Sequence, residues 1–410
     1  MDVIYKVCCG LDVHKNKIVA CLKVKGKKDV IREFSGQTED IREMGKWLKD
    51  ENCEKVAMES TASYWKPLVN IFEIKGLNYT VINARDYKNL PGKKTDVLDS
   101  QWIADLLQHG MLRDSYIPTR EQRELREATR YRKSLTQERT RALNRLQKML
   151  EGANIKITTV LSEVMGVTSR NLIEYILEHD EDITKEKAKE LAANKRVDGK
   201  LDAIVKAMEG IITPFQKQMM KEVIKHIDEL TQRIKEMDII IDEYMKEYEE
   251  SKKKLQEIPG IGKRASEIIL AEIGQDMSRF PTAGHISSWA GLCPGNNESA
   301  GKRRSGKTRK GNKILKAILV ECAQVAKKNK NTFFHAQYQR LVVKKGKNRA
   351  KVAVAHSMLI AIYYMLKENR NYTELGSDFY NKFNKEKKAN AYMKKIKELG
   401  YDVQLIAQVI

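Results

Sequence analysis

Two aspartates three positions apart open a helical stretch in the segment KTDVLDSQWIADLL, at residues 93–106. Residues with this spacing share one face of a helix, so Asp96 and Asp99 can direct their carboxylates to the same point. Acidic side chains in a first helical turn also favour the helix dipole, and Asp96 is of a residue type that caps helices. The spacing by itself therefore permits two interpretations, a helix cap and a shared cation site.

Two further acids lie in apolar segments that have the composition of strands. Asp12 interrupts the run VCCGLDV, where a buried carboxylate is costly unless a cation accompanies it. Glu59 closes the run KVAMES, and the carboxyl ends of strands are where α/β sheets build their sites. Each has an ordinary alternative: a solvent-facing strand position for Asp12 and a surface or capping acid for Glu59. His14 shares the face of Asp12, and we interpret it as a structural neighbour.

The order of the four acids is more informative than any one of them. An aspartate in the first strand, a glutamate at the end of a later strand and D-x-x-D opening a helix are expected of a ribonuclease-H-like nuclease core. Carboxylates in such a core hold two divalent cations, which stabilise attacking and leaving oxygens in phosphoryl transfer. Hard oxygen ligands suit Mg²⁺ or Mn²⁺ and argue against Zn²⁺. The predicted ligands, which are also the predicted catalytic acids, are Asp12, Glu59, Asp96 and Asp99.

The elements that must position these acids can be predicted from residue patterns. Residues 5–25 have the pattern of two strands joined by a polar turn at HKN, and DVIREF, KVAMES and NYTVIN follow as three more. Helices are predicted at about 39–49, after Ser63, and over the segment that holds Asp96. Three strands in hairpin order followed by strand–helix alternation indicate a mixed sheet covered by helices. We therefore assign residues 1–116 to a ribonuclease-H-like (RuvC-like) domain.

Residues 117–254 are predicted to form long helical arms. Their clearest feature is a run of apolar residues spaced alternately three and four apart, which is the seam of a heptad repeat. This heptad seam consists of Met220, Val223, Ile227, Leu230, Ile234, Met237, Ile241, Tyr244 and Tyr248. The seam can pack against a helix of the same chain or form a coiled coil with a second protomer, and the pattern leaves both interpretations open.

A compact and mainly helical domain is predicted for residues 255–345, with a helical extension over 346–410. IPGIGKRASEIILAEIG at its start has the pattern of a helix-hairpin-helix. Gly260 and Gly262 allow a tight turn whose amides, with Lys263, could contact a phosphate at a helix N-terminus. The alternative is close packing of two helices through a glycine turn. The fold class is thus α/β plus α.

A strongly basic segment follows, with eight Lys and Arg between residues 302 and 316 and no acid. Such a segment is typical of a nucleic-acid contact surface. The predicted contacts are Lys302, Arg303, Arg304, Lys307, Arg309 and Lys310. Ser299 stands just before it among small residues that leave a hydroxyl accessible, although a loop serine is ordinarily a turn or cap residue. Ser299 has no nearby Asp or His that would mark a hydrolase triad, and it does not lie in the hydrolase motif G-x-S-x-G.

Composition bounds the class of partner. The 410-residue chain carries 76 Lys and Arg against 55 Asp and Glu, a formal charge of +21, which indicates a polyanionic partner such as nucleic acid. The N-terminus lacks a signal-peptide pattern, and no apolar run approaches a membrane span. The six cysteines show no CxxC pair or zinc spacing. We therefore expect a cytoplasmic, nucleoid-associated protein without a membrane partner.

Taken together, these motifs resemble the DEDD-type insertion-sequence transposases of the IS110 family. GLDVHK, MESTASYW and KTDVLDSQWIADLL are similar to the family's nuclease half. IPGIG, RFPTAGHISSWAGLCPGNNESAGK and RKGN are similar to its transposase half. The resemblance covers about half of the chain, at roughly residues 5–116 and 255–325. It does not extend to residues 152–212 or to the tail beyond about residue 370.

The resemblance implies a specific activity. The four acids match the family's metal ligands, and Ser299 matches the serine that attacks DNA and forms a phosphoserine link; Ser305 stays open as a neighbouring alternative. It also implies DNA partners (element ends and target), a guide RNA (bridge RNA) encoded by the element, and a homo-oligomer, dimer to tetramer, with composite sites. Two rival hypotheses are a Holliday-junction-type nuclease that uses metal-activated water and a non-enzymatic coiled-coil organiser of nucleic acid.

Overall fold

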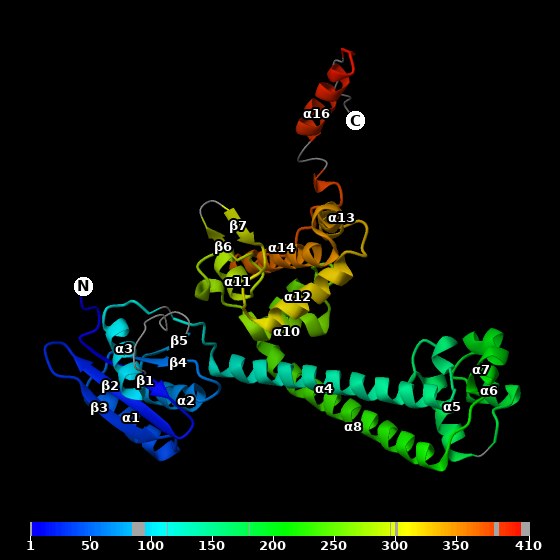
Figure 1. Cartoon of the computed structure of the whole chain (residues 1–410), viewed down its shortest axis with the longest axis horizontal. Helices are drawn as coiled ribbons and strands as arrows, with labels where there is room; N and C mark the ends of the chain where they lie inside the picture. The colour runs from blue at the N-terminus through cyan, green and yellow to red at the C-terminus, as the bar shows by residue number, and fades with distance from the viewer. Residues whose placement is uncertain are drawn as a thin grey trace. The chain divides into compact units, whose positions relative to one another are not determined.

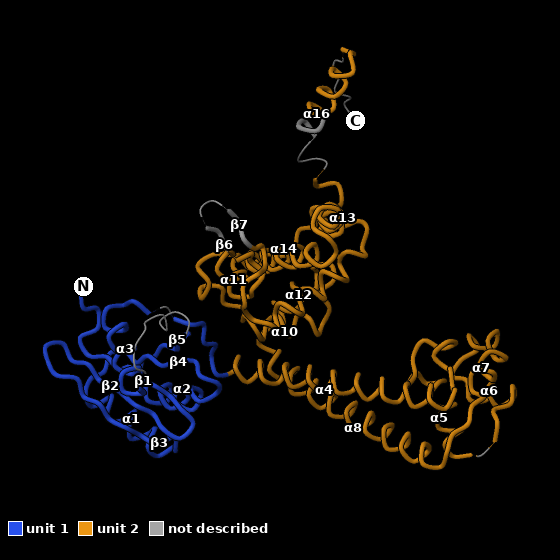
Figure 2. The backbone as a smooth tube through the Cα atoms, viewed as in Figure 1, with its two compact units in different colours: residues 1–120 blue, residues 121–410 orange. Residues whose placement is uncertain are grey.

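The computed structural model describes residues 2–83, 95–112, 114–179, 181–295, 297–299, 302–380 and 385–402, with the backbone alone for 297–299, 302–304 and 385–388. The chain divides into two compact units, Met1–Arg120 and Glu121–Ile410 (Figure 2). We describe each unit by itself.

The N-terminal unit is built on a five-stranded mixed sheet. Its strands are β1 (Val7–Val13), β2 (Lys17–Val24), β3 (Val30–Ser35), β4 (Lys55–Glu59) and β5 (Tyr79–Ile82), in the spatial order β3-β2-β1-β4-β5. The β1–β2 and β2–β3 pairs are antiparallel, and the β1–β4 and β4–β5 pairs are parallel. The mixed sheet expected from the sequence is therefore confirmed.

Helices cover both faces of this sheet, because side chains alternate between the two faces along each strand. Leu11 and Met58 belong to a core with α1 (Thr38–Asp50) and α2 (Trp65–Lys75). Cys8 and Ala57 face the other way and pack against α3 (Asp96–Gln108) through Ile103 and other apolar residues of that helix. Asp12 and Glu59 point to this second face, and Asp96 and Asp99 belong to the helix that covers it.

The second unit begins with two long antiparallel helices, α4 (Arg120–Gly152) and α8 (Pro214–Tyr244), which run side by side (Figure 1). Arg139 Nε of α4 donates a hydrogen bond to Thr231 Oγ1 of α8 at 2.7 Å. Between them the chain forms a distal lobe, residues 153–213, with α5 (Val167–Glu178), α6 (Lys185–Leu191) and α7 (Leu201–Met208). Arms and lobe share one apolar core.

The heptad seam packs within the chain. Seam residues from Met220 to Ile234 are buried in the same core as Leu135 and Leu146 of α4. For this part of the seam the contacts favour the alternative of packing against a helix of the same chain, because α4 covers its apolar side chains. Apolar periodicity specifies that a helix face is buried but not which helix buries it.

The C-terminal helices of the second unit that pack together are α9 (Glu249–Gln256), α10 (Lys263–Ile273), α11 (Ala283–Trp289), α12 (Lys313–Ala326), α13 (Phe333–Lys345) and α14 (Lys347–Lys367). The strands β6 (Asn297–Ser299) and β7 (Lys302–Ser305) lie between α11 and α12 in the chain, and α16 (Lys385–Glu398) follows α14. α14 has the length and apolar composition of a membrane span. Its residues Val354, Met358 and Ile362 are buried in the protein.

Candidate functional site

Three of the side chains singled out in the sequence meet at the carboxyl end of β1. His14 Nε2 lies 3.1 Å from Asp12 Oδ2 and 3.6 Å from Asp96 Oδ1. One ligand atom from each of the three residues lies within 4.8 Å of the other two. We call these three residues the Asp12 cluster. A single cation has room to contact all three, so the donor set fits a divalent metal ion.

Gly10 brings α3 close enough to β1 to build this cluster. A Cβ atom at Gly10 would lie 2.3 Å from the carbonyl oxygen of Ser100 and 2.4 Å from the amide nitrogen of Ala104. Only glycine fits without displacement of the helix backbone. The first turn of α3 therefore lies at the end of β1, and D-x-x-D approaches Asp12 from a distant part of the sequence.

Asp96 is the first residue of α3 and not its cap. Thr95 is the N-cap, and its Oγ1 accepts a hydrogen bond from the Leu98 amide at 3.2 Å. The alternative interpretation of Asp96 as a helix cap is therefore wrong, because the preceding hydroxyl already accepts from the helix end. This leaves the Asp96 carboxylate available to the cluster, and 43% of the side chain is exposed.

Glu59 and Asp99 lie near the cluster without completing it. Glu59 ends β4, and the parallel register aligns Met58 of that strand with Leu11 of β1. Glu59 therefore follows at the same sheet edge as Asp12 and on the same face. Among the described residues, the three-residue grouping includes neither Glu59 nor Asp99. The prediction that all four acids bind metal is thus supported by position most directly for Asp12 and Asp96.

The environment of Asp12 disfavours its charged form. Burial raises the pKa of this carboxyl, the charges of Asp96 and Asp99 raise it further, and His14 opposes them. Lys17 lies 3.8 Å from Asp96, but its ammonium is 2.8 Å from Glu33 and is shared with that acid. A cation bound at the cluster would restore the favourable electrostatics that burial removes.

The sequence analysis interprets His14 as a structural neighbour of Asp12. In the structure its Nε2 faces two carboxylates. The shared face follows from the sequence, because residues two apart in a strand point to one face. Asp12 and His14 stand in D-x-H at the end of β1, which already places the imidazole beside the acid.

The basic segment forms a β-hairpin on the C-terminal helices (Figure 1). Ser299 is the last residue of β6 and is registered opposite Lys302 of β7. The side chains of Ser299, Lys302, Arg303 and Arg304 lie outside the described set. Ser305 Oγ accepts a hydrogen bond from the Lys307 amide at 3.2 Å, so this hydroxyl is engaged in a local turn.

The second strand of the hairpin leads into an exposed basic surface. Lys307, Arg309 and Lys310 are exposed, and within the described part of the chain none of them forms an ion pair. The Gly295 amide donates to the Lys307 carbonyl at 2.9 Å, which holds the base of the hairpin together. Unpaired surface cations of this kind suit phosphate contacts.

The glycine turn before α10 is explained mainly by packing. Gly260 has φ +93°, and a Cβ there would lie 2.5 Å from the Cys322 carbonyl oxygen of α12. Gly262 is exposed at the start of α10. Lys263 Nζ is 2.9 Å from an Asp242 carboxylate oxygen, and this hydrogen bond raises the pKa of Lys263. The expected phosphate contact at Lys263 therefore competes with an acid of the same chain.

Two fully buried glutamates of α10 pair with arginines of α4, and the sequence interpretation did not identify them. Arg130 donates to both carboxylate oxygens of Glu272, at 2.8 and 2.9 Å, and Asn312 Nδ2 donates at 2.6 Å. Asn312 also caps α12, where the chain leaves the basic segment. Arg132 Nη1 donates to Glu267 Oε2 at 2.7 Å. These contacts join α4, α10 and the start of α12.

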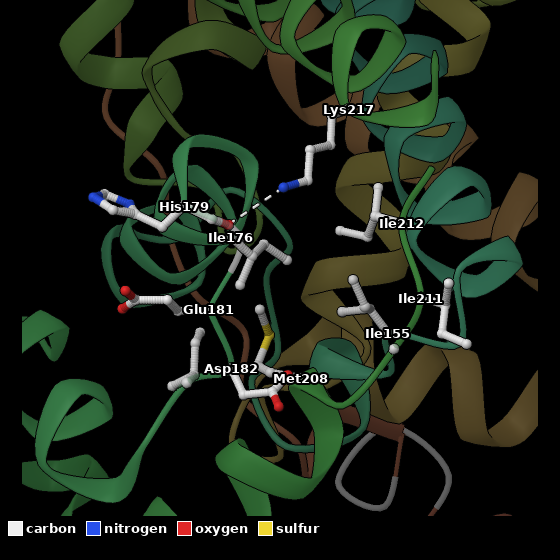
Figure 3. Close-up of a pocket in the computed structure, with 11 residues that line it drawn as sticks. Ile155, Ile176, His179, Glu181, Asp182, Met208, Ile211, Ile212 and Lys217 are labelled. Carbon is white, nitrogen blue, oxygen red and sulfur yellow. Dashed lines mark hydrogen bonds between the residues drawn. The ribbon is translucent and has the colours of Figure 1, made fainter. Parts of the chain in front are cut away.

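A cavity of about 250 Å³ lies in the distal lobe (Figure 3). Its wall includes Ile155, Ile176 and Met208, and Lys217 Nζ donates to the His179 carbonyl oxygen at its rim at 3.3 Å. The wall also carries the polar side chains of His179, Glu181, Asp182 and Lys217, beside isoleucines and Met208.

Both halves of the chain match families of known proteins. Residues 9–155 match a family model described as Transposase, of the DEDD type of IS110 elements. Residues 252–339 match a model described as Transposase IS116/IS110/IS902 family. Together the two stretches make up more than half of the chain.

Similar curated proteins agree with these matches over shorter stretches. The chain is 28% identical over 145 residues to the Transposase for insertion sequence element IS1111A of Coxiella burnetii (strain RSA 493 / Nine Mile phase I), covering 32% of this chain and 40% of that protein. It is 31% identical over 119 residues to the Pilin gene-inverting protein of Moraxella bovis, covering 28% and 37%. The chain thus spans about two fifths of the length of these relatives.

Proposed function

The chain belongs to the IS116/IS110/IS902 family of transposases, and on that premise we propose that it cuts and rejoins DNA strands to move an insertion sequence. The observation that carries the proposal is the Asp12 cluster, which lies within the stretch matched to the DEDD model. The matched relatives are named a transposase and a gene-inverting protein, and both names describe rearrangement of DNA.

Asp12, Glu59, Asp96 and Asp99 would hold Mg²⁺ or Mn²⁺ at the carboxyl edge of β1 and β4. Bound there, such ions stabilise negative charge on the attacking and leaving oxygens of a phosphodiester. The sheet fixes Asp12 and Glu59, and Gly10 fixes the approach of α3 that carries Asp96. The acids are thus held on rigid elements, which favours a precise geometry.

Ser299 would be the nucleophile. Its Oγ attacks the scissile phosphorus, an Oγ–P bond forms, and the bond from phosphorus to the 3′ oxygen breaks. The 3′ oxygen takes up the proton lost by the serine hydroxyl. A 3′ hydroxyl of the second strand then attacks the phosphoserine, which restores Ser299 and joins the strands. Its position opposite Lys302, beside a basic surface, supports this role because cations there neutralise phosphates.

The partners we propose are DNA, comprising the element ends and the target, and a guide RNA encoded by the element. The charge of +21 supports binding to nucleic acid of both kinds. The four acids belong to one compact unit and Ser299 to the other. A homo-oligomer, dimer to tetramer, would let the acids of one protomer act with the serine of another. Sequencing of nucleic acid that co-purifies with the protein tests the RNA assignment.

A covalent adduct tests the central claim. The full chain is incubated with Mg²⁺ and DNA that carries the ends of its element, and the products are separated on a denaturing gel. We expect a protein–DNA adduct with wild type and with Ser305→Ala, and none with Ser299→Ala. Ser305 is the matched control because it stands in the same hairpin and its hydroxyl already has a partner.

Each of the two alternative hypotheses predicts a different result in the same experiment. Free cleaved ends without an adduct, insensitive to Ser299→Ala and abolished by Asp12→Ala, would indicate a junction nuclease that uses metal-activated water. If replacement of Asp96 and Asp99 by alanine leaves every activity intact, the chain is a non-enzymatic organiser. An adduct formed equally by Ser299→Ala would refute the serine assignment alone.

A further inference from the structure

We infer that His14 is a nitrogen ligand of the metal site and makes this site prefer Mn²⁺ over Mg²⁺. The inference rests on the proposed function, because it concerns the cation that the acids would hold. It goes beyond the four acids, since it adds a donor of a different chemical kind and thereby selects among divalent ions.

The position of the imidazole nitrogen is that of a ligand atom. Two ligands at a right angle around an ion with bonds of about 2.1 Å lie about 3 Å apart. His14 Nε2 lies 3.1 Å from Asp12 Oδ2 and 3.6 Å from Asp96 Oδ1. A histidine that merely oriented Asp12 would need one of these contacts. The same nitrogen faces both carboxylates, as expected where three donors surround one ion.

The fold holds His14 in this position through its backbone. Its amide donates to the Lys17 carbonyl at 2.9 Å, which closes the turn between β1 and β2. Asp12 is registered opposite Val19 in the same strand pair. The cluster is thus preformed at a rigid strand end, and the loss of side-chain freedom on metal binding is small.

Charge also favours a cation at this nitrogen. The cluster contains two carboxylates and an imidazole, and the ammonium of Lys17 lies closer to Glu33 than to Asp96. A neutral imidazole can donate its lone pair to a metal ion placed between the acids. In that arrangement the ion replaces the proton that Asp12 and His14 share in their hydrogen bond.

The donor set determines the ion. Carboxylates accept Mg²⁺ and Mn²⁺ alike, whereas imidazole binds transition-metal ions better than the hard, strongly hydrated Mg²⁺. Removal of the imidazole should therefore weaken Mn²⁺ binding by about tenfold, which is the size of effect seen when a group that supports a metal site is lost. Mg²⁺ binding should change by less than about twofold, because oxygen donors and water supply that ion's ligands.

The experiment uses the full chain without DNA. Mn²⁺ and Mg²⁺ are titrated calorimetrically, and electron spin echo envelope modulation of bound Mn²⁺ detects a directly bonded ¹⁴N nucleus. The variant is His14→Gln, which keeps a hydrogen-bond donor for Asp12. The matched control is His109→Gln, at the opposite end of α3, where Nδ1 contacts the Asp105 carbonyl.

We expect ¹⁴N coupling in wild type and His109→Gln, and its loss in His14→Gln together with the selective loss of Mn²⁺ affinity. Coupling that persists in His14→Gln overturns the inference, and so does an equal fall for both ions, which would mark a positioning residue. Asp12→Asn separates the two proposals. If it abolishes metal binding while His14→Gln changes nothing, only this inference fails; if neither variant affects binding, the proposed metal site itself fails.

Discussion

Two groups of buried carboxylates in this chain differ in what neutralises them. Glu267 and Glu272 are fully buried in the second unit, and arginines from α4 donate to both. Asp12 is buried in the N-terminal unit and is hydrogen-bonded to His14, with Asp96 close by. In one group the chain supplies the positive charge; in the other it gathers more negative charge.

The difference separates a structural role from a chemical one. A buried ion pair with good geometry joins elements, and Glu272 links α4 to the N-cap of α12 in this way. A buried acid that other acids surround is unstable unless a cation arrives, which is a property of metal sites. Burial alone therefore does not identify a functional carboxylate. The identity of its partner does.

The largest expected effect comes from breaking the structural group. Arg132→Met leaves Glu267 buried without the cation that donates to it, at a cost of about 3–5 kcal/mol in the free energy of unfolding. Thermal unfolding of the second unit measures this. Arg141→Met is the control on the same helix, because Arg141 is 65% exposed and its pair with Glu138 is worth below about 1 kcal/mol. Equal losses would contradict the comparison.

A smaller loss is expected when α3 is pushed away from the sheet. Gly10→Ala places a Cβ against the backbone of Ser100 and Ala104, and such overpacking costs about 1–3 kcal/mol. Because α3 carries Asp96, metal affinity should fall as well, which calorimetry with Mn²⁺ measures. Gly26→Ala is the control: its φ of +78° makes it strained, but it has open space and should leave metal affinity unchanged.

Removing the cap of α3 tests the position of Asp96 more gently. Thr95→Ala loses the side-chain acceptor for the Leu98 amide and should cost about 1 kcal/mol. Faster amide exchange in the first turn of α3 would report the frayed end. Thr95→Ser keeps the acceptor and should restore wild-type exchange. A normal first turn in the alanine variant would show that other contacts hold Asp96 in place.

The smallest expected change in stability has the opposite sign. Asp12→Asn removes a carboxylate that burial and neighbouring acids disfavour, so the unfolding temperature in EDTA should rise slightly while metal binding is lost. The folded-state pKa of Asp12 lies above its ordinary value of 3.8, so the folded wild type holds its proton more tightly than the unfolded chain. Wild type should therefore lose stability as the pH rises from the unfolded-state pKa of Asp12 to its higher folded-state pKa.

The stability of Asp12→Asn does not depend on this proton. The variant should therefore be more stable than wild type at pH values above the raised pKa of Asp12, and the difference should vanish in acid. Thermal scans in EDTA at a series of pH values measure the difference between the two proteins. If Asp12→Asn is less stable than wild type at neutral pH, Asp12 has a structural role like that of Glu267 and Glu272. The two groups of buried carboxylates would then not differ in role.

The sequence alone predicted the strands, the mixed sheet and the helix that begins with D-x-x-D. Alternation in β1 and helical spacing in α3 record which face of each element is buried, and this information is local. The acids Asp12 and Asp96 could be selected because carboxylates at strand ends and helix starts are visible in the chain's order. The family resemblance, which the family matches bear out, also came from such local motifs.

Tertiary structure alone decided which side chains meet. Gly10 allows α3 to approach β1, which brings His14 to Asp96 across some eighty residues of sequence. Likewise α4 covers the heptad seam, α12 explains Gly260, and arginines of α4 neutralise Glu267 and Glu272. A periodic pattern states that a face is buried, but the partner depends on distant contacts, whose free energy arises only once the chain has folded.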